Sequence, residues 1–148
     1  MQYFAYASNM HPDQMQARAP AAVFVTRARL PDHTLTFPRR SDYWEGGVAS
    51  FVPATGQSVW GVVYEITEQD KAGLDQYEGV RQGAYDTATV EVVDEVGRAV
   101  KVMTYKATAH GNYRPSPKYV THILDAARHW SLSAECEAWW RQRLVPTS

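Results

Sequence analysis

Glu78 is the ionisable residue whose predicted position most needs an explanation. Apolar residues at helical spacing predict a short helix that ends at Glu78-Gly79, so the carboxylate lies where the helix dipole disfavours negative charge. Its neighbours Leu74, Tyr77 and Val80 are apolar or aromatic. A carboxylate buried in such surroundings has a raised pKa and can exchange protons near neutral pH. Glu78 is therefore a candidate acid–base group; the alternative is a solvated glutamate at a helix end.

The first residues of the chain form a candidate ligand-binding segment. Tyr3 to Tyr6 predict a short buried strand, and Ala7-Ser8-Asn9 stop it with small and polar side chains. Asp13 to Arg18 then predict a short helix. A loop between the end of a strand and the start of a helix can leave backbone N–H groups free to bind an anion. The alternative is an ordinary strand, turn and helix.

Other familiar chemistries have little support in the sequence. Cys136 lies between Glu135 and Glu137, whose charges disfavour a thiolate, so we expect a structural thiol. The five histidines lack the spacing of metal ligands, and we predict no metal site. Ser8 lacks the Gly-x-Ser-x-Gly elbow of serine hydrolases.

Composition limits the class of protein. With 148 residues we expect a single domain over residues 1–148, and a net charge of −1 with scattered basic residues predicts no nucleic-acid or membrane partner. The single cysteine excludes an internal disulfide, and no signal-peptide or membrane-spanning pattern is present, so we expect a cytoplasmic protein. A homodimer stays open: Trp130, Trp139 and Trp140 would form an exposed apolar patch unless they pack in the core, which we favour.

The remaining pattern predicts more strands than helices. We expect breaks at Pro31-Asp32 and at Pro53 and Gly56, with a surface loop over residues 38–47. Residues 57–66 predict a central strand, and residues 85–93 and 99–107 a hairpin. Helices should start at Thr67, where Asp70 is the acid three residues on, at Ser116-Pro117 and near Ser133. The order indicates an α+β domain built on a small mixed, barrel-like sheet with flanking helices.

Several segments together resemble the γ-glutamylcyclotransferase family. The similarity starts with Tyr3-Phe4-Ala5-Tyr6-Ala7-Ser8-Asn9-Met10, where the family has Tyr-Phe-Ala-Tyr-Gly-Ser-Asn-Leu. It continues in order through Ala28-Arg29-Leu30-Pro31-Asp32, Trp44-Glu45-Gly46-Gly47-Val48-Ala49, Val59-Trp60-Gly61-Val62-Val63-Tyr64, Leu74-Asp75-Gln76-Tyr77-Glu78-Gly79-Val80 and Pro115-Ser116-Pro117-Lys118-Tyr119. The resemblance covers residues 2 to about 125, and it implies a small barrel with a cavity closed by the first loop.

The resemblance also implies a reaction and the residues that perform it. In this family the α-amino group of a γ-glutamyl unit attacks its own γ-carbonyl, which forms 5-oxoproline and releases an amine or amino acid. Glu78 matches the catalytic glutamate. The substrate-binding positions would be Tyr3, Phe4, Ala5, Tyr6, Ala7, Ser8 and Asn9, with Tyr85 and Tyr119 as substrate-contacting tyrosines. No cofactor is implied, and the partner would be a small γ-glutamyl substrate.

One position departs from the family pattern. Ala7 stands where the family has glycine, and if that position requires a positive φ, alanine would cost on the order of 1 kcal/mol. Two alternatives to a cyclotransferase of γ-glutamyl amino acids therefore remain. The first is a cyclotransferase that acts on γ-glutamyl amines or on a biosynthetic intermediate. The second is a γ-glutamyl or amino-acid binding module that has lost turnover, with Ala7 as the lesion.

Overall fold

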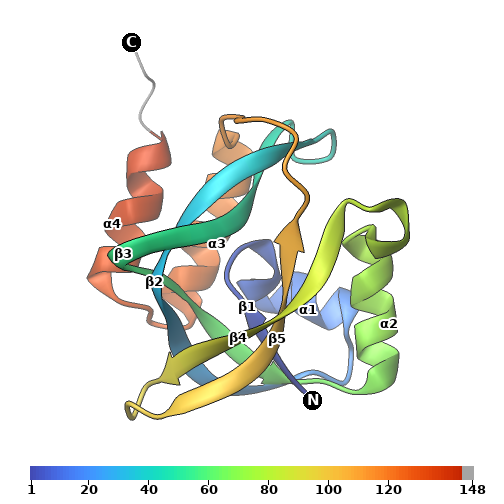
Figure 1. Ribbon diagram of the computed structural model, residues 1–148, viewed down its shortest axis with the longest axis vertical. Helices are drawn as coiled ribbons and strands as arrows, with labels where there is room; N and C mark the ends of the chain where they lie inside the picture. Colours follow the sequence, from blue (N-terminus) through green and yellow to red (C-terminus); the bar gives the residue numbers. More distant parts are fainter. Residues whose placement is uncertain (145–148) are drawn as a thin grey trace.

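The chain folds into a closed five-stranded barrel, as a computed structural model that describes residues 1–144 shows (Figure 1). The strand order is β1-β3-β2-β4-β5. β1 closes the barrel because it pairs antiparallel with β3 and parallel with β5; the other neighbours are antiparallel. The strands are β1 (Gln2–Ala5), β2 (Val23–Ser41), β3 (Gly46–Glu65), β4 (Tyr85–Asp94) and β5 (Ala99–Ala107). The predicted α+β fold with a barrel-like mixed sheet is confirmed.

Helices flank the barrel. Figure 1 shows α3 and α4 side by side at one side of the sheet, and α1 and α2 at another. None of the helices in the described residues is long and apolar enough to cross a bilayer. The helices are α1 (Pro12–Arg18), α2 (Glu68–Tyr77), α3 (Pro117–His129) and α4 (Ala134–Arg141), with 3-10 turns η1 (Ser8–Met10), η2 (Val80–Gln82) and η3 (Gln142–Leu144).

The predicted helix starts are confirmed. Thr67 and Asp70 form a reciprocal capping box at the start of α2. Ser116 caps α3, with proline at its first position, and Ser133 caps α4. These starts depend only on local hydrogen bonds, which is why the sequence reveals them.

β2 and β3 are longer than the sequence indicates, and the expected breaks are wrong. Asp32 adopts a φ of 59° at a register shift between Pro31 and His33, and its Oδ1 accepts the N–H of Gly56 at 3.0 Å. This contact bends the two strands together without ending them. The surface loop predicted over residues 38–47 is also wrong, because only residues 42–45 form the turn between the strands.

The barrel is tightly packed where β1 crosses β3. A Cβ added to Gly61 would lie 2.3 Å from the carbonyl oxygen of Ala5, so only glycine permits this approach. At the other end of the chain, Trp140 and Cys136 are buried in the core, while Trp130 stacks on Phe24 with ring centroids 4.2 Å apart. Burial and the nearby glutamates raise the pKa of the Cys136 thiol to about 12, as expected for a structural cysteine.

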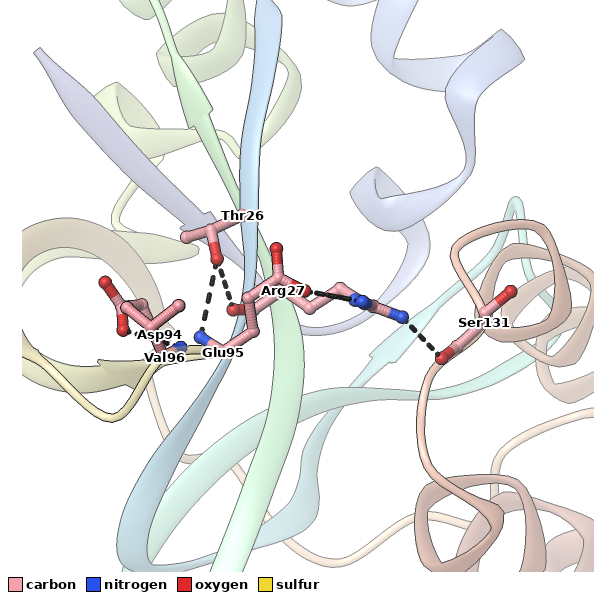
Figure 2. Close-up of polar contacts among 6 residues, drawn as sticks. All are labelled: Thr26, Arg27, Asp94, Glu95, Val96 and Ser131. Atoms are coloured by element: carbon pink, nitrogen blue, oxygen red, sulfur yellow. Dashed lines mark hydrogen bonds and ion pairs between the residues drawn. The ribbon is translucent and has the colours of Figure 1, made fainter.

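Polar contacts around Arg27 join β2 to the β4–β5 turn and to the α3–α4 connection (Figure 2). Arg27 Nε donates to Glu95 Oε2 at 2.8 Å, and Nη1 donates to the carbonyl of Ser131 at 3.2 Å. Asp94 Oδ1 accepts the N–H of Val96 at 3.1 Å within the turn. None of these residues lines the cavity described below, and the exposed ion pair contributes at most about 1 kcal/mol.

Candidate active site

A cavity of about 910 Å³ lies between β1, α1, the end of α2 and α3. This volume suits a small-molecule site and can hold a ligand of dipeptide size. Eight of the ten predicted site residues line it: Tyr3, Tyr6, Ala7, Ser8, Asn9, Glu78, Tyr85 and Tyr119. Phe4 and Ala5 do not. Both side chains are buried in the core, as the alternation of β1 requires for Phe4.

Local backbone geometry brings Glu78 to this cavity. Glu78 is the C-cap of α2, and its N–H donates to the carbonyl of Leu74 at 2.8 Å. Gly79 then takes the left-handed conformation with a φ of 65°, which ends the helix at low steric cost. The chain turns away from the helix axis at this point, and the glutamate side chain lines the cavity.

The Glu78 carboxyl is tuned for proton exchange near neutral pH. Desolvation by burial raises its pKa to about 7, against the opposing effects of the Arg18 charge and the hydrogen bond from Asn9. Asn9 Nδ2 donates to Glu78 Oε1 at 3.0 Å. A group with this pKa is present in both protonation states at pH 7 and can accept and then release a proton.

Asn9 is held in one orientation by its neighbours. Its Oδ1 accepts hydrogen bonds from Gln14 Nε2 at 2.9 Å and from Arg18 Nη1 at 3.1 Å. The amide nitrogen must therefore face the other way, where it donates to Glu78 and to the Tyr3 hydroxyl at 2.9 Å. The loop and the carboxylate thus form one hydrogen-bonded unit, although 69 positions separate Asn9 from Glu78 in the sequence.

Tyr85 and Tyr119 meet at the backbone of Ala49. The register shift between Thr36 and Arg39 leaves Ala49 without a partner on β2. The Ala49 N–H instead donates to the Tyr119 hydroxyl at 3.0 Å, and the Tyr85 hydroxyl donates to the Ala49 carbonyl at 3.1 Å. Burial raises the pKa of both phenols well above the ordinary value, so both remain protonated. Tyr119 therefore keeps its own proton to donate, and Tyr85 keeps a lone pair to accept.

The backbone conformation of Ala7 shows whether this position requires the positive φ that favours glycine. Its φ is −140°, outside the left-handed region that favours glycine. Ala7 is the N-cap of η1, and the first bond of this turn runs from the Met10 N–H to the Ala7 carbonyl at 3.0 Å. The N–H groups of residues 7–9 precede that bond and have no acceptor within the turn. Alanine therefore fits here without left-handed strain.

Among the cavity residues that the sequence did not reveal are three ionisable ones, Arg18, Arg39 and His122. Arg18 lies one turn beyond Gln14 on α1, so their i,i+4 spacing was an available signal that both face the same loop. Arg39 was hidden by the wrong assignment of its segment to a surface loop. His122 stacks on His11 with ring centroids 4.3 Å apart, and burial followed by the His11 charge lowers its pKa to about 4. Nothing in the sequence pairs these histidines.

Within residues 1–144, no group of three or more histidine, cysteine, aspartate or glutamate side chains is arranged to hold a metal ion. The site itself offers three kinds of group for chemistry. These are a half-titrated carboxyl, two neutral phenols and a loop with free backbone donors.

Comparisons with known proteins agree with this fold. The fold is that of a barrel with flanking helices seen in a solved gamma-glutamyl cyclotransferase, which superposes with a TM-score of 0.93 at 31% identity over 100% of this chain and 89% of that one. The AIG2-like family model matches residues 58–139. The gamma-glutamylcyclotransferases of Bos taurus and Homo sapiens are 35% and 34% identical over 137 residues, covering 90% of this chain and 73% of each relative. The chain belongs to the AIG2-like γ-glutamylcyclotransferase family, so the predicted resemblance is confirmed.

Proposed function

We propose that the protein is a γ-glutamylcyclotransferase, which converts a γ-glutamyl compound to 5-oxoproline and releases the amine or amino acid attached to the γ-carbonyl. The observation that carries this proposal is Glu78, a carboxyl with a pKa of about 7 that lines a cavity of dipeptide size and is bonded to the loop of residues 7–9. Membership in the family supports the same reaction.

Glu78 would act first as a base and then as an acid. Its ionised form takes a proton from the substrate's α-ammonium group, and the freed amine attacks the γ-carbonyl carbon to form the ring C–N bond. The protonated carboxyl then donates that proton to the departing nitrogen as the original C–N bond breaks. Ring closure costs the attacking nitrogen a second proton, which the released amine takes up to become an ammonium ion. Both protons lost by the substrate's ammonium therefore end on the leaving group, and the reaction is balanced and redox-neutral.

The loop and the two tyrosines would hold the γ-glutamyl unit folded for attack. Backbone N–H groups of residues 7–9 are suited to the α-carboxylate and to the developing oxyanion. Tyr119 would donate to an anionic oxygen and Tyr85 would accept from the ammonium, since these are the capacities that their bonds to Ala49 leave unused. Because ring closure is intramolecular, holding this conformation supplies a large share of the rate enhancement.

A binding module without turnover has less support than the enzyme. That alternative treats Ala7 as a lesion, yet the φ of −140° gives alanine no left-handed strain to cause one. Simple binding would also not require a carboxyl with a pKa near 7, whose ionised form destabilises the fold.

The test is direct. The protein is incubated with a panel of γ-glutamyl amino acids, γ-glutamyl amines and glutathione, and 5-oxoproline and the released amine are both quantified. We expect equal amounts of the two products. Glu78→Gln should still bind substrate by calorimetry but lose nearly all turnover. Glu68→Gln, an exposed glutamate at the other end of α2, is the matched control and should be fully active. No product from any substrate, or a fully active Glu78→Gln, would refute the proposal.

A further inference from the structure

Two buried nitrogen atoms in the described part of the chain have no hydrogen-bond partner, Arg39 Nη1 and His122 Nε2. Both residues line the cavity. A buried polar group without a partner is rare in native proteins, and in a cavity the natural missing partner is a ligand. The guanidinium of Arg39 can only donate and is always charged, so its missing partner is an acceptor with negative charge.

The fold directs Arg39 to the cavity. Phe37 and Pro38 lie at the register shift that follows Thr36, and Arg39 then pairs with Val48 across β2 and β3. Directly opposed residues project to the same face of a sheet, and Val48 lines the cavity too. The neighbouring Arg40 also lines the cavity, but its side chain is exposed and ion-paired with Asp42, with 2.6 Å between Nη1 and Oδ1. Arg40 thus already has an anionic partner, whereas Nη1 of Arg39 is buried without one.

We infer that Arg39 is a specificity-determining residue that binds a carboxylate on the departing half of the substrate, so that the enzyme selects γ-glutamyl compounds whose leaving group is an amino acid over those whose leaving group lacks an anion. This inference rests on the proposed function. It adds to that function a residue that chooses between the leaving groups.

The charges around the cavity separate Arg39 from the reacting carboxyl. Arg18 is the cation that lowers the pKa of Glu78, and Arg39 is not among the groups that shift it. The α-carboxylate of the γ-glutamyl half has donors in the loop of residues 7–9, next to Asn9 and Glu78. A second anion-binding group elsewhere in a cavity of about 910 Å³ therefore fits the second carboxylate of a γ-glutamyl amino acid.

The test compares γ-glutamyl-alanine with γ-glutamyl-alaninamide, which differ only in the charge of the departing half. For the wild-type protein we expect kcat/KM for the acid to exceed that for the amide by about 10–100-fold, the value of a charge-assisted hydrogen bond. Arg39→Met should remove this preference by lowering kcat/KM for the acid alone, and Arg39→Lys should restore part of it. Arg29→Met is the control: Arg29 is on the same strand, donates to Ser58 and lies outside the cavity, so both substrates should be unaffected.

The possible results distinguish a failure of the proposed function from a failure of the inference about Arg39. A wild-type protein that turns over neither compound would overturn the proposed function and this inference with it. Turnover of both compounds at the same kcat/KM would overturn the inference alone. An equal loss for both substrates in Arg39→Met and in Arg39→Lys, with unfolding midpoints unchanged, would also overturn it, because Arg39 would then serve the γ-glutamyl half.

Discussion

Replacing Glu78 with glutamine should make the protein more stable, and only at neutral and alkaline pH. The folded state raises the pKa of this carboxyl from an ordinary 4.5 to about 7. The folded protein therefore holds its proton between these values while the unfolded chain loses it, so stability is complete at acid pH and falls as the pH rises toward 7. At about 1.4 kcal/mol per pKa unit, the ionised glutamate destabilises the fold by about 3 kcal/mol above pH 7.

Glutamine has nearly the shape of the protonated acid and cannot ionise. We expect Glu78→Gln to be within about 0.5 kcal/mol of wild type at pH 4.5, and about 2–3 kcal/mol more stable at pH 8, where water in the cavity screens part of the effect. Urea unfolding followed by tryptophan fluorescence measures both values, and Glu68→Gln at the exposed end of α2 controls for the loss of one charge. A gain of equal size at both pH values, or no gain at pH 8, would refute the raised pKa.

Three further perturbations follow from the same geometry. Arg18→Met removes a charge that lowers the pKa of Glu78, so the rising limb of kcat/KM against pH should move to higher pH, while Arg18→Lys should leave it near pH 7. Ala7→Gly should lower the free energy of unfolding by about 0.4–1 kcal/mol through the freedom it gives the unfolded chain, and 5-oxoproline formation should persist, because glycine can adopt the φ of −140° that Ala7 has. Gly61→Ala should destabilise by about 1–3 kcal/mol in urea unfolding, because its Cβ would meet the Ala5 carbonyl; an unchanged midpoint would contradict the close approach of β1 and β3.

Destabilisation by Glu78 is consistent with a functional role. A carboxylate that burial keeps half-protonated weakens the fold, and a residue with no task could be replaced by glutamine without this penalty. The local environment does not relieve the effect: Asn9 and Arg18 lower the pKa, but desolvation is the larger influence. Poor solvation thus gives Glu78 the raised pKa that the proposed acid–base role requires.

Local interactions explain which features the sequence predicts well. The caps at Thr67, Ser116 and Ser133 need only a side chain and a backbone group three residues away. The hairpin of β4 and β5 depends on alternation and one short turn. The misplaced acid at Glu78 could also be recognised, because the end of its helix is visible in the same short window.

Long-range contacts explain what the sequence alone leaves undecided. β2 continues through Asp32 because a carboxylate meets the N–H of Gly56 on another strand. Ala49 binds Tyr85 and Tyr119 only because a bulge on β2 leaves it without a backbone partner there. No local sequence pattern indicates that these tyrosines replace the strand partner. Residue types and short spacings by themselves determined the helix starts, the hairpin and the candidate acid. The tertiary structure decided which polar groups share the cavity and which of them lack a partner, because burial and pairing depend on residues that lie far apart in the chain.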